Sequence, residues 1–110
     1  MTVQSAAREG ANPLRGEAML PVTGRPRLLR PSFTALVAAE AELGPLLALV
    51  ERAGAGELRL AEMAALFWHC LADCDEVPRE AVGEAVVAQG LAACAAPLRV
   101  LLGQILKGVG

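Results

Sequence analysis

The residues best suited to chemistry are one histidine and three cysteines. His69 and Cys70 are neighbours, Cys74 follows four residues later, and Cys94 is distant. A cysteine–histidine nucleophile requires the two side chains to converge, whereas adjacent residues of a helix point in directions about 100° apart. His69 therefore cannot readily activate Cys70, and we interpret it as a semi-exposed residue at the edge of the core. Nothing in the sequence provides a base for Cys94.

A metal site is the alternative for the same residues. Cys70 and Cys74 have the spacing of one helical face, but structural zinc usually needs four ligands, paired across a turn. The odd number of cysteines also argues against a disulfide framework. We therefore expect Cys70 and Cys74 to be inert and buried, with no metal and no cofactor.

Acidic residues and glycines offer no further catalytic arrangement. Asp73, Asp75 and Glu76 are interpreted as a loop between helices with a helix-capping role. Gly54 and Gly56 lack the Lys-Ser or Lys-Thr of a phosphate-binding loop. The sequence therefore predicts no catalytic residues and a protein that is not an enzyme.

The elements that position these residues begin with a hairpin over residues 16–30. Residues 16–22 alternate, with Ala18, Leu20 and Val22 on one face, which indicates a strand. Thr23-Gly24-Arg25 predicts the turn, and a second short strand is expected around residues 27–30. Three prolines, at positions 21, 26 and 31, remove ladder donors and predict an edge or irregular hairpin.

Helical spacing dominates from Ser32 to Lys107. Ser32 predicts an N-cap, Gly44 a helix end, and Gly90 an interruption. The clearest helix is expected over residues 60–73, with Asp75 or Glu76 capping the next, and Pro97 should kink the last helix or begin a new one. The sequence thus predicts a mainly α fold: a short N-terminal β-hairpin followed by a compact bundle of four or five helices. Residues 1–13 are expected to be a disordered tail and residues 14–110 a single helical domain.

Composition narrows the function further. The 110 residues are 55% hydrophobic but only 3% aromatic, so Leu, Val and Ala must fill the core. The net charge of −2 disfavours nucleic-acid binding, and we interpret Arg25, Arg27 and Arg30 as solvated hairpin charges. The longest uncharged stretch, residues 85–98, is too short to span a membrane. Because no signal peptide is recognisable either, a cytoplasmic protein is expected.

Several segments, in this order and spacing, resemble the gene transfer agent tail assembly chaperone family, also labelled a tail tube protein family. They are Asn12-Pro13-Leu14-Arg15-Gly16-Glu17, then Leu20, Val22 and Gly24, then Leu29-Arg30, Ala35-Leu36, Glu40, Leu43-Gly44, and the stretch from Leu60 to Trp68. The resemblance begins near Ala11 and continues to the C-terminus. Pro31 replaces an expected strand residue, which points to a short second strand.

The resemblance implies a phage-tail morphogenesis factor that binds the tape measure protein before the tail tube assembles around it. Tape measure proteins are long helical rods, so an apolar helix surface is the expected contact. The candidate contact residues are Trp68, on an alanine-lined face, and the C-terminal helix at Leu98, Leu101, Leu102 and Ile105. These leucines and Ile105 are equally compatible with the core.

Other readings remain open. The chain could be a structural tail component, such as a tube or adaptor subunit, although tube subunits are typically sheet-rich. A helix-turn-helix regulator is disfavoured by the acidic balance and by the long connection at residues 73–77. A small enzyme using Cys94 lacks a base, and the sequence leaves open whether the chain forms a homo-oligomer.

Overall fold

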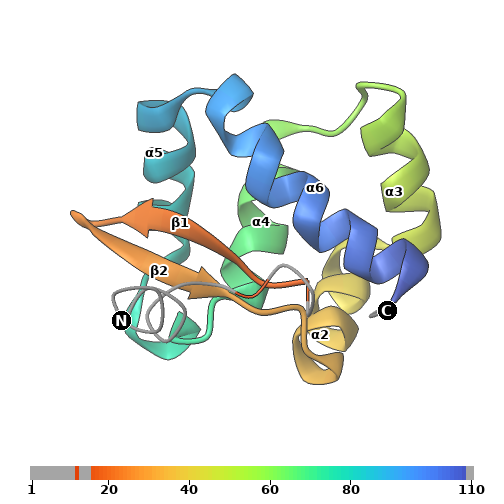
Figure 1. The fold of residues 1–110 in the computed structure, drawn as a ribbon, viewed down its shortest axis with the longest axis horizontal. Helices are drawn as coiled ribbons and strands as arrows, with labels where there is room; N and C mark the ends of the chain where they lie inside the picture. Colours follow the sequence, from red (N-terminus) through yellow and green to blue (C-terminus); the bar gives the residue numbers. More distant parts are fainter. Residues whose placement is uncertain (1–11, 13–15, 109–110) are drawn as a thin grey trace, which may run out of the picture.

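A hairpin precedes a set of helices in the computed structural model, which describes residue 12 and residues 16–108 (Figure 1). Strands β1 (Ala18–Val22) and β2 (Arg25–Leu29) are antiparallel. The helices that follow are α2 (Phe33–Leu43), α3 (Leu46–Gly54), α4 (Leu60–Cys70), the 3₁₀ helix η2 (Cys74–Glu76), α5 (Arg79–Gln89) and α6 (Leu91–Lys107). The predicted mainly helical fold with an N-terminal hairpin is confirmed. The tail expected over residues 1–13 lies outside the described residues, apart from Asn12.

The hairpin turn consists of Thr23 and Gly24, both with positive φ, at 52° and 84°. Two central residues with positive φ make a type I′ turn, whose twist matches that of the strands it joins. Val22 therefore faces Arg25 directly, and Pro21 faces Pro26. Because the turn uses only two residues, β2 begins at Arg25 rather than near Arg27 as the sequence suggested. It ends at Leu29, so the strand is short, as expected from the position of Pro31.

The outer side of β2 is paired with the chain just after α4. The amide of Ala72 donates to the carbonyl of Leu28 at 2.9 Å, and the amide of Arg30 donates to the carbonyl of Cys70 at 2.6 Å. Leu71 is extended, with φ −62° and ψ 129°, so α4 ends at Cys70. The sequence predicted that this helix continues to Asp73. The pairing that ends it at Cys70 involves a strand far away in the sequence, so local signals could not reveal it.

Helix ends follow the predicted local signals in most places. The Ser32 hydroxyl accepts a hydrogen bond from the amide of Ala35 at 3.1 Å, and Gly44, at φ 91°, ends α2. The prediction that Asp75 or Glu76 caps α5 is wrong, because both lie in η2 and Pro78 occupies the cap position. Helix α6 continues through Pro97 without a fresh start.

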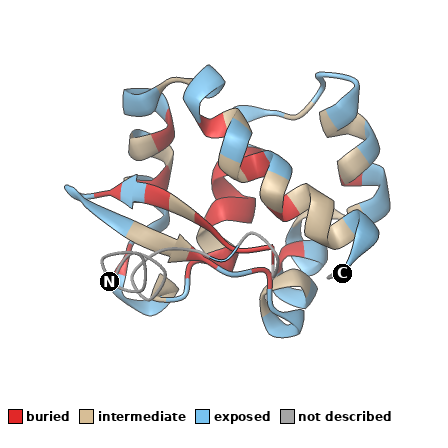
Figure 2. Ribbon diagram, in the orientation of Figure 1, coloured by how far each residue is buried: buried red, intermediate tan, exposed pale blue. Residues whose placement is uncertain are grey.

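The core is built around α4 (Figure 2). This helix packs against α2 and α5, while β1 packs against α5 and α6. The buried face of β1 consists of Ala18, Leu20 and Val22, as predicted from the alternation. The buried residues of α4 are Met63, Ala64, Ala65, Leu66, Phe67 and Cys70.

No single helix among the described residues has both the length and the apolarity to cross a membrane. Helices α2 and α3 reach that threshold only when joined, and the chain bends by 76° between them.

Candidate functional site

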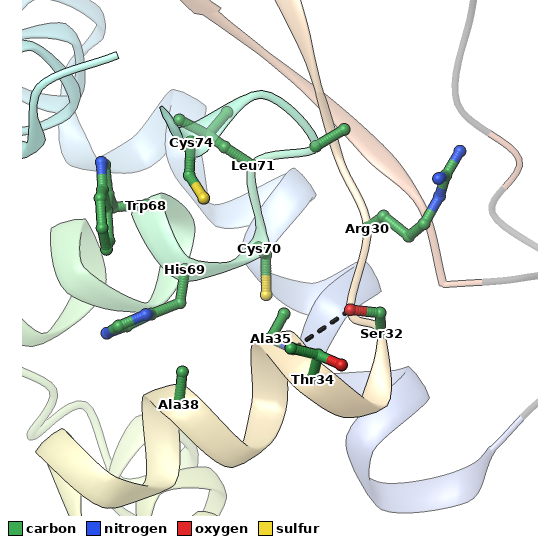
Figure 3. A pocket seen from close by; sticks show the side chains of 11 residues that line it. Arg30, Ser32, Thr34, Ala35, Ala38, Trp68, His69, Cys70, Leu71 and Cys74 are labelled. Atoms are coloured by element: carbon green, nitrogen blue, oxygen red, sulfur yellow. Dashed lines mark hydrogen bonds between the residues drawn. The ribbon is translucent and has the colours of Figure 1, made fainter. Parts of the chain in front are cut away.

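A groove of about 450 Å³ lies between α2 and the end of α4 (Figure 3). One side is formed by the start of α2 and the residues before it, the other by the last turn of α4 and the segment that follows. The lining residues are Arg30, Ser32, Thr34, Ala35, Ala38, Trp68, His69, Cys70, Leu71, Ala72 and Cys74. No carboxylate is among them.

Small side chains leave this groove open. The methyl groups of Ala35 and Ala38 face the thiol of Cys70 and the ring of His69 across it, and the Arg30 side chain extends away from it (Figure 3). The guanidinium of Arg30 is held instead by Glu17, through Nε and Oε2 at 3.1 Å. The groove is therefore an apolar recess that could accept a side chain from a partner.

Trp68 lines one end of this groove but is also tied to the fold. Its indole Nε1 donates to the carbonyl of Val77 at 2.7 Å, and the guanidinium of Arg79 lies 4.8 Å from its ring centroid. Of the alanines expected to share its face, Ala65 is buried, whereas Ala61 and Ala72 are exposed. Trp68 is thus half-buried, with its indole N–H bonded to the segment before α5 and its ring next to Arg79 at the start of α5.

His69 belongs to a charge cluster rather than to a nucleophile pair. Its Nε2 lies 2.8 Å from Oε1 of Glu42, which also pairs with Arg79. The hydrogen bonds from Arg79 and then from His69 hold the pKa of Glu42 below its ordinary value. His69 is partly buried and points away from Cys70 (Figure 3). The two side chains therefore diverge, as expected for adjacent residues of a helix.

The three thiols differ in their surroundings. Cys70 and Cys94 are buried; burial raises the pKa of Cys70 to about 12 and also raises that of Cys94. Cys74 is only partly buried, so the prediction that it is buried like Cys70 is wrong. Because α4 ends at Cys70, Cys74 lies in η2 rather than on the buried face of α4. Within the described part of the chain, no three His, Cys, Asp or Glu residues are grouped to hold a metal ion.

The candidate residues on α6 separate into two pairs. Leu98 and Leu101 are buried in the core, whereas Leu102 and Ile105 are only partly covered. The next residue, Leu106, is 55% exposed. The α2–α4 groove has no lining residue from α6, so the structure does not bring these residues together with Trp68 at that groove.

The interpretation of Arg27 as a solvated charge is wrong, and one exposed apolar face was not predicted. Arg27 is not a solvated charge: its side chain is 11% exposed and its Nη1 lies 2.7 Å from Oδ2 of Asp73. On α2, Phe33 and Val37 point outward and are 84% and 49% exposed. The first feature depends on a contact between distant segments; the second follows from the helical period, because Ala39 marks the opposite, buried face.

Residues 15–108 match the family described as "Phage tail tube protein, GTA-gp10". The chain belongs to this family. It is a phage tail assembly chaperone family and a non-enzymatic one, which confirms the predicted absence of enzyme activity and implies tail proteins as partners. No curated protein and no solved structure matches the chain.

In this tail assembly chaperone family member, Gly16 and Glu17 of the N-terminal segment that carries the resemblance have structural contacts. Gly16 has φ 75°, and a Cβ there would overlap the Gln104 side chain of α6. The buried Glu17 accepts hydrogen bonds from the amide of Asn12 and from Arg30, each at 3.1 Å. Gly16 thus lets the start of β1 approach α6, and Glu17 ties the start of β1 to the residue that follows β2.

Proposed function

We propose that the chain is a tail assembly chaperone that binds the tape measure protein in the cytoplasm before the tail tube forms. The observation that carries this proposal is the family match over residues 15–108. The finer assignment, to the tape measure protein, rests on the physical fit between an apolar groove and a long helical rod.

The α2–α4 groove supports this assignment. Recognition of a helix in a groove uses a few apolar anchor side chains of the partner, and an open recess lined by Ala35, Ala38 and Leu71 can accept such an anchor. Trp68 is held at the end of the groove by Val77 and Arg79. A large side chain held in place loses little conformational entropy on binding, which is one reason why Trp is common at binding hot spots.

The end of α6 is a second contact candidate. Leu102 and Ile105 are partly covered, and Leu106 is mostly exposed at the same end of the helix. Apolar side chains with helical spacing suit a helical partner, so this end of α6 can extend the contact beyond the groove.

Charge argues against nucleic acid as the partner. A DNA-binding surface neutralises phosphates with free Lys and Arg side chains. Here Arg27, Arg30, Arg52 and Arg79 each pair with a carboxylate, and the net charge is −2. A protein partner is therefore the better fit.

Co-expression with the tape measure protein of the same phage-like particle tests the proposal. We expect the tape measure to gain solubility and to co-purify with this chain. Ala38→Phe, which fills the groove, should reduce the co-purified amount, whereas Ala88→Phe on the exposed side of α5 should not. A tape measure that is equally soluble alone and does not co-purify would refute the chaperone function.

A structural tail component is the second candidate, favoured by the tail-tube wording of the family description. Against it, the hairpin is the only sheet in the described residues and has two strands. Mass spectrometry of finished particles separates the two. Stoichiometric amounts of this chain in ordered rings would replace the chaperone assignment.

A further inference from the structure

Side chains from three helices meet at one end of the α2–α4 groove. Ala38 of α2 lines the groove, and Glu42 lies one turn further along the same face of α2. Its Oε1 is 2.8 Å from Nε2 of His69 on α4, and its Oε2 is 2.5 Å from Nη1 of Arg79 on α5. One carboxylate therefore joins α2, α4 and α5.

The two partners of Glu42 both lie against Trp68. The guanidinium carbon of Arg79 is 4.8 Å from the centroid of the Trp68 ring, a distance at which a cation is attracted to an aromatic face. The ring of His69 meets that of Trp68 edge to face, with centroids 5.1 Å apart and an angle of 71° between the planes. Two side chains that share one carboxylate thus contact the indole.

Stability alone does not account for this arrangement. The side chains of Glu42 and Arg79 are 38% and 42% exposed, and an exposed ion pair contributes little to stability because water and salt screen it. Its larger effect is on freedom of movement, since an unpaired arginine side chain samples many rotamers. Among the described residues, no other carboxylate pairs with Arg79 or His69. Glu42 is therefore the group that holds both of them beside the indole.

We infer that Glu42 is a positioning residue for partner binding, because it orders Trp68 at the end of the groove through Arg79 and His69. An apolar anchor of the tape measure helix then packs against a ring that is already fixed, so less conformational entropy is lost on binding. The identity of the partner rests on the proposed function. The ordering of Trp68 is a property of the isolated chain and is tested separately.

Tryptophan fluorescence tests the ordering without any partner, because Trp68 is the only Trp in the chain. Glu42→Gln keeps the size of the side chain but removes its charge and one acceptor oxygen. We expect its emission to shift to longer wavelength and its quenching by acrylamide to increase. Glu40→Gln is the matched control on the same helix, where the carboxylate accepts the amide of Leu46, and it should leave both signals unchanged.

Unfolding measurements separate positioning from a structural role. Urea midpoints and circular dichroism of Glu42→Gln should stay close to those of the parent, because the ion pair is exposed. Unchanged fluorescence in Glu42→Gln, or a change accompanied by loss of helix content, would overturn the inference.

Competition for the tape measure protein tests the effect on binding. The parent and a variant, carrying different tags, are co-expressed with a limiting amount of tape measure. The parent should be captured in preference to Glu42→Gln by about two- to tenfold, the cost of ordering one side chain on binding, whereas Glu40→Gln should compete equally. In an Arg79→Gln background, Glu42→Gln should have a smaller effect, because the two act in one chain of contacts.

The outcomes distinguish this inference from the proposed function. Equal capture of Glu42→Gln and the parent would overturn the role of Glu42 in binding, and so would an effect of the same size in the Arg79→Gln background. A parent chain that captures no tape measure would refute the proposed chaperone function. The ordering of Trp68 by Glu42 would then still be decided by fluorescence.

Discussion

Substitution of Trp68 should separate its structural contacts from its contribution to binding. Trp68→Phe keeps an aromatic ring but removes the hydrogen bond to the carbonyl of Val77, a loss of about 0.5–1.5 kcal/mol in the free energy of unfolding. Trp68→Ala also removes the ring against which Arg79 packs. Truncation of a buried Trp costs about 3–5 kcal/mol, and since Trp68 is only half-buried we expect about 3 kcal/mol.

Urea unfolding followed by circular dichroism measures both losses. With a dependence of about 1.5 kcal/mol per M urea, Trp68→Ala should lower the midpoint by about 2 M and Trp68→Phe by less than about 1 M. Leu47→Ala, at a side chain 61% exposed on α3, is the control and should change stability by less than about 0.5 kcal/mol. An unchanged midpoint in Trp68→Ala would refute the view that Trp68 is held by the fold. If the midpoint is unchanged, a weaker pull-down of the tape measure by Trp68→Ala would report a loss of binding and not of stability.

Three further substitutions or measurements probe other parts of the fold. Gly16→Ala should destabilise the chain by at least about 2 kcal/mol, because φ 75° is strained for alanine and the new methyl group overlaps α6; calorimetry should show Tm falling by roughly 8 °C or more. The pKa of Glu62 is lowered from 4.5 to about 2, chiefly by its hydrogen bond with Arg52 and then by one from a backbone amide. This pair should stabilise the fold above pH 4.5 and lose its effect as the pH falls toward 2. The substitution Arg52→Gln should return the pKa of Glu62 toward 4.5, as measured by NMR titration. Because burial raises the pKa of Cys70 to about 12, this thiol should remain protonated and resist alkylation at pH 8, while Cys74 reacts first; equal labelling of the two in mass spectrometry would contradict the structure.

Local signals in the sequence were enough to predict much of the fold. The Ser32 cap, the stop at Gly44, the interruption at Gly90 and the Thr23-Gly24 turn each depend on residues next to one another in the chain. The physics of caps and turns acts over the same few residues, so the sequence pattern and the structure agree there.

The path between α4 and α5 could not be predicted in this way. Leu71 pairs with β2, and the carbonyl of Val77 accepts a hydrogen bond from Trp68. These tertiary contacts hold residues 71–77 in an extended and then 3₁₀ path, which displaces the start of α5 from Asp75 or Glu76. Local capping preference is worth only about 1 kcal/mol and is readily overridden.

The candidate site was predictable only in part. The sequence placed Trp68 on an alanine-lined face of its helix as a candidate contact residue, and it lies at one end of the groove. The groove itself is formed by two segments far apart in sequence, α2 and the end of α4, so its lining could not be derived from either alone. On α6, periodicity grouped Leu98 and Leu101 with Leu102, but only packing against the rest of the fold shows which of them are buried.

The pairing of β2 with residues 70–72 has a consequence for synthesis on the ribosome. The hairpin can form as soon as its own residues emerge, because its contacts are local. Its outer edge at Leu28 and Arg30 stays without partners until the end of α4 has also left the exit tunnel. An open strand edge is a template for pairing with another nascent chain. Pro26, next to the turn on β2, has no amide to donate there, so during that interval the tip of the nascent hairpin is protected against pairing with a neighbouring chain.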